Sequence, residues 1–395
     1  MPALHGAGVV LSGCPAYVPW NRPRSPAMRA PHRSLGRMLH RALKVIARPV
    51  KSDRGRGGVV VHAFRGYGAA TRVEVMGRVF RQLPLGVSAP EGSLRRDLLD
   101  VLRRGLRWGI KGIPVTLELH GQRQTVTTDR DGYFDIHMAL AAPLVSERIW
   151  HRGRLDAVIR GEHSVGSQAE IYVPPPTLDL VVISDIDDTV MRTGVANKLK
   201  MMYRLFLRQA HQRTAFAGVA EFYRALFAGA DGHRYRPMLY VSRGPWGLYE
   251  VLEEFFQRNR IPIGPILFLR EWGLTLQRPL PRRAREHKYR LIEQMLALYA
   301  RQPLVLIGDS GQHDPETYAR VVREHPGRVK AIYIRHVHRA SARDDEIARL
   351  AREVAEDGCH LVLTDDSAEM AAHAHDLGLV STAGLTAVRR AVAQA

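Results

Sequence analysis

Six short apolar runs, separated by helical stretches, constrain the fold of the second half of this chain. Each run has few polar residues; they lie at 178–184, 238–242, 266–269, 304–308, 330–334 and 360–363. Stretches with helical periodicity lie between most of them, at 218–226, 247–259, 287–300 and 314–325. Strands buried on both faces are typically continuous apolar runs, and helices between them provide the crossovers that parallel strands need. We therefore predict an α/β fold, with a parallel sheet covered by helices on both faces.

The sequence before this part is rich in short β-type runs. They lie at 59–64, 72–80, 115–120, 125–128, 133–137, 155–159 and 169–173, with one helical stretch at 94–108. Turn signals such as Asp131-Gly132 separate them. Pro174-Pro175-Pro176 is a stiff linker that marks the boundary to the α/β part. We predict a smaller, mainly-β, sandwich-like domain over 58–176. It contains no catalytic cluster in sequence, so a positioning or lipid-facing module and a plain scaffold both remain open.

Basic residues dominate the N-terminal segment, residues 1–57. This segment has eleven Lys or Arg and one acid, Asp53, while the whole chain carries a formal net charge of +19. Residues 1–32 are expected to be disordered because they are rich in Pro, Gly and Arg. Residues 34–48 have apolar and basic positions at helical spacing, which predicts an amphipathic helix. That helix would lie in a membrane interface or dock on the protein's own core. The predicted organisation is thus 1–57, 58–176 and a catalytic domain over 177–395.

The charge and the apolar segments limit the classes of partner and compartment. Basic segments attract nucleic acid, anionic lipid headgroups or phosphorylated substrates, although an arginine-rich solvated surface is the plainer interpretation. The chain has no strong nucleic-acid signature such as a helix-turn-helix or zinc finger. No run approaches the ~18 apolar residues of a membrane-spanning helix, a signal-peptide pattern is missing, and Cys14 and Cys359 form no disulfide framework. We expect a cytoplasmic protein with peripheral contact at the inner membrane surface.

Polar residues gather where three of the predicted strands end. They are Asp185, Asp187, Asp188 and Thr189 after the first run; Ser242, Arg243 and Gly244 after the second; and 308–314, with Asp309 and Asp314, after the fourth. Lys288 opens the helix before that fourth run. Ligands in such sheets bind beyond the carboxyl ends of the strands. The spacing therefore predicts one site at one edge of the sheet.

These residue types suit phosphoryl transfer. A carboxylate can attack phosphorus and form an acyl phosphate, and Asp185 is the candidate nucleophile. Asp187 is the candidate general acid and base, and Lys288 would neutralise charge on the transferring group. Mg²⁺ is expected as cofactor because it prefers hard oxygen ligands, here Asp185, Asp187, Asp309 and Asp314. Thr189, Ser242, Arg243 and Gly244 would bind the phosphate, whereas Asp188 has no assigned role.

In this order, the motifs resemble those of the haloacid-dehalogenase superfamily of phosphohydrolases, whose Rossmann-like parallel sheet is the expected fold. More narrowly, four strings resemble the actin-patch-associated phosphatidate phosphatases and their bacterial members. The strings are 184–189 (S-D-I-D-D-T), 240–249 (Y-V-S-R-G-P-W-G-L-Y), 307–316 (I-G-D-S-G-Q-H-D-P-E) and 332–335 (I-Y-I-R). Gly244 departs from the pattern, which has a small polar residue there. Upstream, 65–68 (R-G-Y-G) resembles the segment before the catalytic domain in bacterial members.

The resemblance implies Mg²⁺-dependent hydrolysis of phosphatidate to diacylglycerol and phosphate, with phosphatidate or a related anionic phospholipid as partner. Two alternatives remain open at this stage. One is a soluble phosphomonoesterase with the same chemistry, acting on nucleic-acid ends or phosphoproteins. The other is a non-enzymatic membrane-binding scaffold. No feature of the sequence identifies protein partners.

Overall fold

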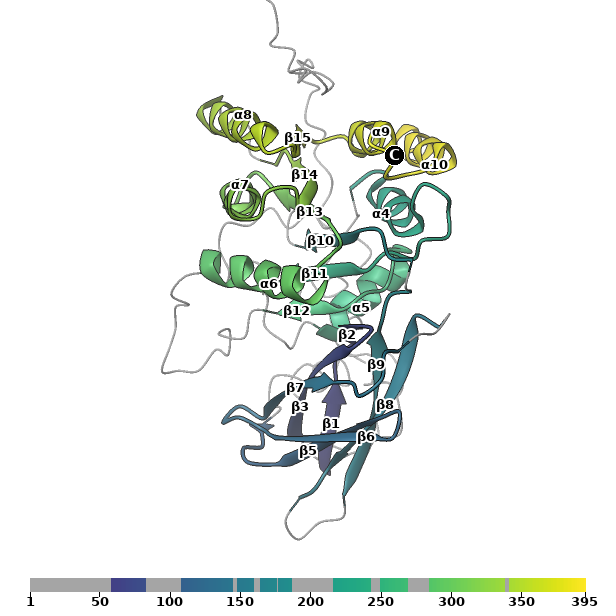
Figure 1. The fold of residues 1–395 in the computed structure, drawn as a ribbon, viewed down its shortest axis with the longest axis vertical. Coiled ribbons are helices and arrows are strands. Elements are labelled where there is room, and N and C mark those ends of the chain that lie inside the picture. The colour runs from purple at the N-terminus through teal and green to yellow at the C-terminus, as the bar shows by residue number, and fades with distance from the viewer. Residues whose placement is uncertain are drawn as a thin grey trace, which may run out of the picture.

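The computed structural model describes residues 58–82, 108–144, 148–159, 164–175, 177–186, 216–242, 249–268, 284–337 and 341–395. These residues form two sheets, one parallel with helices and one mixed (Figure 1). The predicted helix 34–48 and most of the predicted helix 94–108 lie outside the described residues. Trp108, the last residue of that second prediction, is in a strand, so the helix prediction is wrong at this position.

The parallel sheet has six strands in the order β12-β11-β10-β13-β14-β15. The strands are β10 (Val181–Asp185), β11 (Met238–Ser242), β12 (Ile266–Phe268), β13 (Leu304–Asp309), β14 (Val329–Arg335) and β15 (His360–Thr364). All neighbouring pairs run parallel. The apolar runs therefore predicted both the strands and their direction, with ends that differ by at most three residues.

Helices cover both faces of this sheet. One face carries α4 (Val219–Ala228), α5 (Tyr249–Arg258), α9 (Ser367–Asp376) and α10 (Thr382–Ala393), and the other carries α6 (Ala284–Leu298), α7 (Asp314–Glu324) and α8 (Ser341–Glu356) (Figure 1). Successive residues of a strand point to opposite faces. Val182 accordingly packs in the core under α4, while Val181 and Ile183 pack in the core under α6 and α7. This two-sided burial explains why each strand is apolar throughout.

The strand order of the parallel sheet reverses direction at its middle, beside β10. From β10 the chain runs outward through β11 to β12, then returns to β13 on the other side of β10 and continues outward to β14 and β15. At such a reversal the loops after neighbouring strands diverge and leave a crevice outside their carboxyl ends. The ends of β10 and β13 are therefore where a ligand is expected.

The other sheet is mixed and has nine strands, among the described residues, in the order β1-β3-β2-β9-β8-β5-β6, with β4 and β7 paired to β3. They are β1 (Gly58–Ala63), β2 (Gly66–Ala69), β3 (Arg72–Gln82), β4 (Trp108–Gly109), β5 (Pro114–Leu119), β6 (Gln122–Thr127), β7 (Tyr133–Ala139), β8 (Trp150–Ala157) and β9 (Val165–Tyr172). β2 and β9 are parallel, and the other pairs are antiparallel. The hairpin predicted within 114–134 is β5–β6; β7 pairs with β3 instead. The sandwich-like domain stays a prediction.

The mixed sheet contacts the parallel-sheet cores through the segment 64–68. Phe64 packs with Tyr249 of α5, at a ring-centroid distance of 4.7 Å. Tyr67 belongs to the core under α6, and the Tyr299 hydroxyl donates to the carbonyl of Gly68 at 3.1 Å. Arg65 forms an ion pair with Glu253 of α5. The two sheets thus share buried side chains instead of meeting through a polar surface alone.

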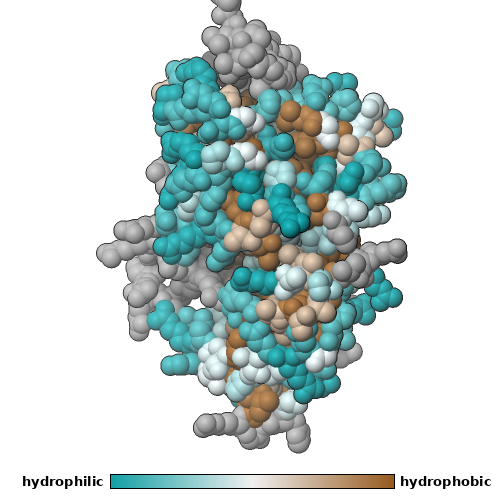
Figure 2. Space-filling view, in the orientation of Figure 1, coloured by the Kyte–Doolittle hydropathy of each residue, from teal (hydrophilic) through white to brown (hydrophobic). Residues whose placement is uncertain are grey.

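The surface is mainly hydrophilic on the side formed by α6, α7 and α8 (Figure 2). In α8, only Ile347, Leu350 and Val354 are buried, at the i, i+3, i+7 spacing of one helix face. None of the helices in the described ranges combines the length and the apolar character needed to cross a bilayer.

Candidate active site

Five of the predicted site residues lie at the carboxyl edge of the parallel sheet. Asp185, Ser242 and Asp309 are the last residues of β10, β11 and β13. Asp314 is the first residue of α7, and Lys288 lies in the second turn of α6. Because the three strands are parallel neighbours, their carboxyl ends lie side by side. The edge predicted from the sequence is therefore the edge that the fold assembles.

Three carboxylates form the centre of this site. Ligand oxygens of Asp185, Asp309 and Asp314 lie within 4.8 Å of one another. Asp185 and Asp309 have 0% exposure, and Asp314 has 2%. Carboxylates so deeply buried are costly unless cations and hydrogen bonds compensate them. The three carboxylates are therefore a candidate cation site.

Lys288 supplies one positive charge. Its ammonium, on a residue 4% exposed, donates to Asp185 Oδ1 at 2.7 Å and to Asp314 Oδ1 at 2.5 Å. It also lies 6.0 Å from the ring centroid of Tyr318. Burial raises the pKa of the Tyr318 hydroxyl well above its ordinary value, so this phenol stays neutral beside the charges. Lys288 thus connects the end of β10 to the start of α7.

The loop from Asp309 to Asp314 folds back on itself. The Asp309 amide donates to Asp314 Oδ2 at 3.3 Å, and the Gly311 amide donates to Asp309 Oδ1 at 2.8 Å. Gly308 makes this approach feasible, because a Cβ at that position would lie 2.4 Å from Asp314 Oδ2 and 2.7 Å from Asp314 Cβ. The glycine before Asp309 is therefore required by the contact with Asp314.

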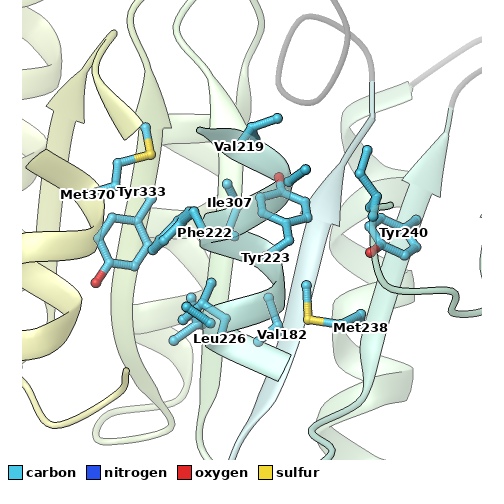
Figure 3. Packing of buried hydrophobic residues seen from close by; sticks show 14 of the residues in the cluster. Val182, Val219, Phe222, Tyr223, Leu226, Met238, Tyr240, Ile307, Tyr333 and Met370 are labelled. Carbon is cyan, nitrogen blue, oxygen red and sulfur yellow. The ribbon is translucent and has the colours of Figure 1, made fainter. Parts of the chain in front are cut away.

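A hydrogen-bonded pair beneath the site was missed by the sequence prediction. Ser184 Oγ donates to the carbonyl of Asp185 at 2.8 Å and lies 2.6 Å from the hydroxyl of Tyr223 on α4. Because the Ser184 hydroxyl proton goes to the Asp185 carbonyl, the Tyr223 hydroxyl, whose pKa burial raises, donates to Ser184. Figure 3 shows Tyr223 between α4 and β10, among apolar side chains. The only sequence signal was a tyrosine on an apolar helix face, whose hydroxyl needs a partner when buried.

The donor set fits Mg²⁺. Three carboxylates and one ammonium sum to −2, which a divalent cation balances. All three ligands are hard oxygens, which Mg²⁺ prefers, and Mg²⁺ usually keeps several waters beside few carboxylates. Asp185, Asp309 and Asp314 are thus the residues that would hold the ion.

The remaining predicted site residues lie outside the described residues. They are Asp187, Thr189, Arg243 and Gly244, together with Asp188. Ser242, 2% exposed, lies one position beyond Val241, which is the register partner of Asp185. It therefore faces the same edge of the sheet as the three carboxylates.

A second group of ligand-type side chains lies on the mixed sheet, where the sequence predicted no cluster. Glu74, Asp135 and His137 offer atoms within 4.8 Å of one another. Glu74 and His137 are register partners across β3 and β7, and Asp135 is on the same face two residues away. Arg72 contacts Glu74 at 2.7 Å, and His137 contacts Asp135 at 3.0 Å. The Arg72 guanidinium therefore offsets part of the charge of this group, as Lys288 does at the carboxyl edge of the parallel sheet.

Two fungal proteins are similar to part of the chain. Phosphatidate phosphatase APP1 of Saccharomyces cerevisiae is 32% identical over 164 residues, which are 42% of this chain and 27% of that protein. An uncharacterized protein of Schizosaccharomyces pombe is 29% identical over 217 residues, 54% of this chain and 34% of that protein. The chain thus spans about a quarter to a third of the length of these relatives.

Solved structures show only weak likeness. A carbohydrate acetylesterase from Xanthomonas citri is 10% identical, covers 85% of this chain and 74% of its own, and gives a TM-score of 0.27. A bacterial immunoglobulin-like domain from the M. primoryensis ice-binding adhesin is 17% identical, covers 30% of this chain and 95% of its own, and gives a TM-score of 0.17. Scores this low carry no argument about fold or function.

The family comparison covers the site itself. Residues 180–336 match the model described as "Phosphatidate phosphatase APP1, catalytic domain". This segment holds Asp185, Ser242, Lys288, Asp309 and Asp314. The part of the chain that carries the site is therefore similar to the catalytic domain of the phosphatidate phosphatase APP1 family.

Proposed function

We propose that this chain is a Mg²⁺-dependent phosphatidate phosphatase with a haloacid-dehalogenase-like catalytic domain. It would hydrolyse phosphatidate to diacylglycerol and phosphate. One observation carries the proposal: the buried Asp185, Asp309 and Asp314, with Lys288 between two of them, lie together within a family-matched catalytic segment. Clustered buried carboxylates at a sheet's carboxyl edge suit a phosphate ligand only with a cation present.

Asp185 acts as the nucleophile in this proposal. One carboxylate oxygen attacks phosphorus, the bond from phosphorus to the lipid oxygen breaks, and an aspartyl phosphate forms. Lys288 holds Asp185 through Oδ1 at 2.7 Å, which fixes the direction of Oδ2. The leaving oxygen takes a proton from Asp187. Water then attacks the phosphorus of the aspartyl phosphate while Asp187 takes a proton from that water, and the bond from phosphorus to Asp185 breaks, which regenerates Asp185 and releases free phosphate.

Mg²⁺, when bound, would offset the repulsion between the carboxylates and the phosphate and stabilise charge that develops on the phosphoryl oxygens. Asp185, Asp309 and Asp314 would hold it. Ser242, at the end of the neighbouring strand β11, would donate to a phosphoryl oxygen. Thr189, Arg243 and Gly244 keep the phosphate-binding roles that the motifs predict.

The lipid part of the proposal rests on the family match and on charge. The net charge of +19 and the basic segment 1–57 favour contact with an anionic bilayer. A cytoplasmic protein bound peripherally at the inner membrane surface fits these features. Domain limits of 1–57, 58–176 and 177–395 remain part of the proposal.

Phosphate release from vesicle-borne phosphatidate tests this function. With Mg²⁺ the chain should release phosphate, and EDTA should stop it. Asp185→Asn should lower the rate on the order of a thousand-fold or more, because the nucleophile is lost. Asp231→Asn is the matched control, since Asp231 is exposed and its contacts, an ion pair with Arg234 and a hydrogen bond from the His233 amide, lie within the same turn region. Full activity of Asp185→Asn would contradict the mechanism.

The same assay separates the alternatives. A 3′-phosphorylated DNA and a soluble phosphomonoester are offered in parallel with the vesicles. Faster turnover of either soluble substrate would support the soluble phosphomonoesterase. No turnover of any substrate, with vesicle binding retained, would support the scaffold.

A further inference from the structure

Arg343 contacts the loop that joins two of the site carboxylates. It lies in the first turn of α8, and its side chain is 17% exposed. This position is seven residues beyond the family-matched segment 180–336. No motif in the sequence includes it, because its surroundings (S-A-R-D-D-E) have the composition of a solvated helix.

The guanidinium donates to two carbonyls of the loop. Arg343 Nε donates to the Ser310 carbonyl at 3.1 Å, and one terminal nitrogen donates to the Gln312 carbonyl at 2.7 Å. Both terminal nitrogens also donate to the Glu316 carboxylate, one of them at 3.1 Å. Arginine presents several donors in one rigid plane, so it can fix three acceptors in relative position.

The contact with Ser310 orients Asp309 through one peptide unit. The Ser310 carbonyl and the Gly311 N–H belong to the same planar peptide bond. In a trans peptide the two groups point in opposite directions and cannot rotate independently. Arg343 holds the carbonyl end, while the N–H end donates to Asp309 Oδ1 at 2.8 Å. The guanidinium therefore fixes the direction of a hydrogen bond that aims the Asp309 carboxylate.

The contact with Glu316 acts on the third carboxylate. Glu316 lies in the first turn of α7, which begins at Asp314. The Asp314 side chain reaches Lys288 and the Asp309 amide from that turn. Arg343 thus fastens both the loop after Asp309 and the helix start that carries Asp314.

The action of Arg343 is geometric, since its charge is already balanced. Glu316 and Glu346 both contact it, the latter at 2.6 Å. The backbone of the loop is held on its other side too: the Ser310 amide donates to the Arg335 carbonyl at 2.9 Å, and the Val337 amide donates to Ser310 Oγ at 3.0 Å. Arg343 adds the hydrogen bond to the Ser310 carbonyl, on the opposite side of the loop backbone.

We infer that Arg343 is a positioning residue for the cation site, which orients Asp309 and Asp314 without touching the ion. This inference rests on the proposed Mg²⁺ site. Groups that orient metal ligands typically contribute 10–100-fold in metal affinity. The planar arrangement of the guanidinium donors, more than their charge, orients Asp309 and Asp314.

Direct Mn²⁺ binding to the full chain, measured by calorimetry without substrate, tests this role. Arg343→Met should raise the Mn²⁺ dissociation constant by about 10–100-fold. Arg343→Lys retains a positive charge but loses the planar set of guanidinium donors, and should raise the Mn²⁺ dissociation constant by nearly as much. If Arg343→Met lowers the melting temperature, Arg343→Lys becomes the informative variant, because lysine retains most of the arginine side chain.

Arg349→Met is the matched control. Arg349 is on the same helix, is 59% exposed and pairs with Glu353 at 2.5 Å, as an ordinary i,i+4 surface pair. Its replacement should leave the Mn²⁺ affinity unchanged. In phosphate release, excess Mg²⁺ should restore the rate of Arg343→Lys toward that of the wild type.

The outcomes separate this inference from the proposed function. Weaker Mn²⁺ binding in both Arg343 variants but not in Arg349→Met supports the inference, even if phosphatidate is not the substrate. Mg²⁺-dependent phosphate release in the wild type with unchanged Mn²⁺ affinity in Arg343→Lys overturns the inference and leaves the function standing. An equal loss of Mn²⁺ affinity in Arg349→Met, or the absence of Mn²⁺ binding by the wild type, also overturns the inference about Arg343.

Discussion

Replacing Lys288 with methionine removes an ammonium that contacts two buried carboxylates. Lys288 is 4% exposed, Asp185 0% and Asp314 2%. The four charged side chains of the site sum to −2 with lysine and to −3 without it. Methionine retains much of the volume, so the variant changes the charge more than the packing.

The expected loss is large because the remaining charges stay buried. Removing one partner of a buried ion pair costs about 3–5 kcal/mol. An exposed pair contributes about 0–1 kcal/mol, so the two situations are easily distinguished. A bound divalent ion stabilises the folded state by about 2.7 kcal/mol at 100 times its dissociation constant. The variant's site, with a charge sum of −3, should bind this ion more tightly than the wild-type site of −2, so the deficit of Lys288→Met should be largest with EDTA and smaller with Mg²⁺.

Urea unfolding followed by circular dichroism, with EDTA or with Mg²⁺, measures both quantities. Lys330→Met is the control, since Lys330 is an exposed residue of β14. Lys288→Met/Asp314→Asn returns the sum to −2 and should recover part of the stability. A loss below about 1 kcal/mol for Lys288→Met in EDTA would refute the interpretation of the cluster as a buried, charge-compensated site.

Two further predictions concern packing and pH. Gly308→Ala should cost about 1–3 kcal/mol, because its Cβ would lie 2.7 Å from Asp314 Cβ; Gly311→Ala, with contacts of 3.1 Å and longer, should cost less in the same unfolding assay, and equal costs would contradict the close approach. Burial lowers the pKa of His373 from 6.5 to about 4, so the unfolded chain binds the proton more tightly, and stability should fall as pH drops from about 6.5 towards 4. Between pH 7 and 4.5 the wild type should lose about 2–3 kcal/mol more than His373→Gln, and identical pH profiles would exclude this contribution.

Local patterns predicted much of the parallel sheet and little of the mixed sheet's pairing. Each strand of the parallel sheet is buried on both faces, so its apolar run is visible in one sequence window. In the mixed sheet, β3 pairs with β1, β2, β4 and β7 along its length, and β7 pairs with β3 instead of with the preceding β6. Pairing between distant strands depends on tertiary packing, which no single window contains.

The sequence by itself determined which chemical groups the site contains and at which edge they lie. Asp185, Ser242, Asp309 and Asp314 stand where apolar runs end or the next helix begins, and parallel strands bring such ends to one edge. Only the tertiary structure decided how these groups are held. Lys288 reaches Asp185 across 103 positions of the chain, Tyr223 supports Ser184 across 39, and Arg343 holds the Ser310 peptide across 33. A residue that acts by orienting another group leaves no motif, because its effect depends on contact in space and not on its neighbours in sequence.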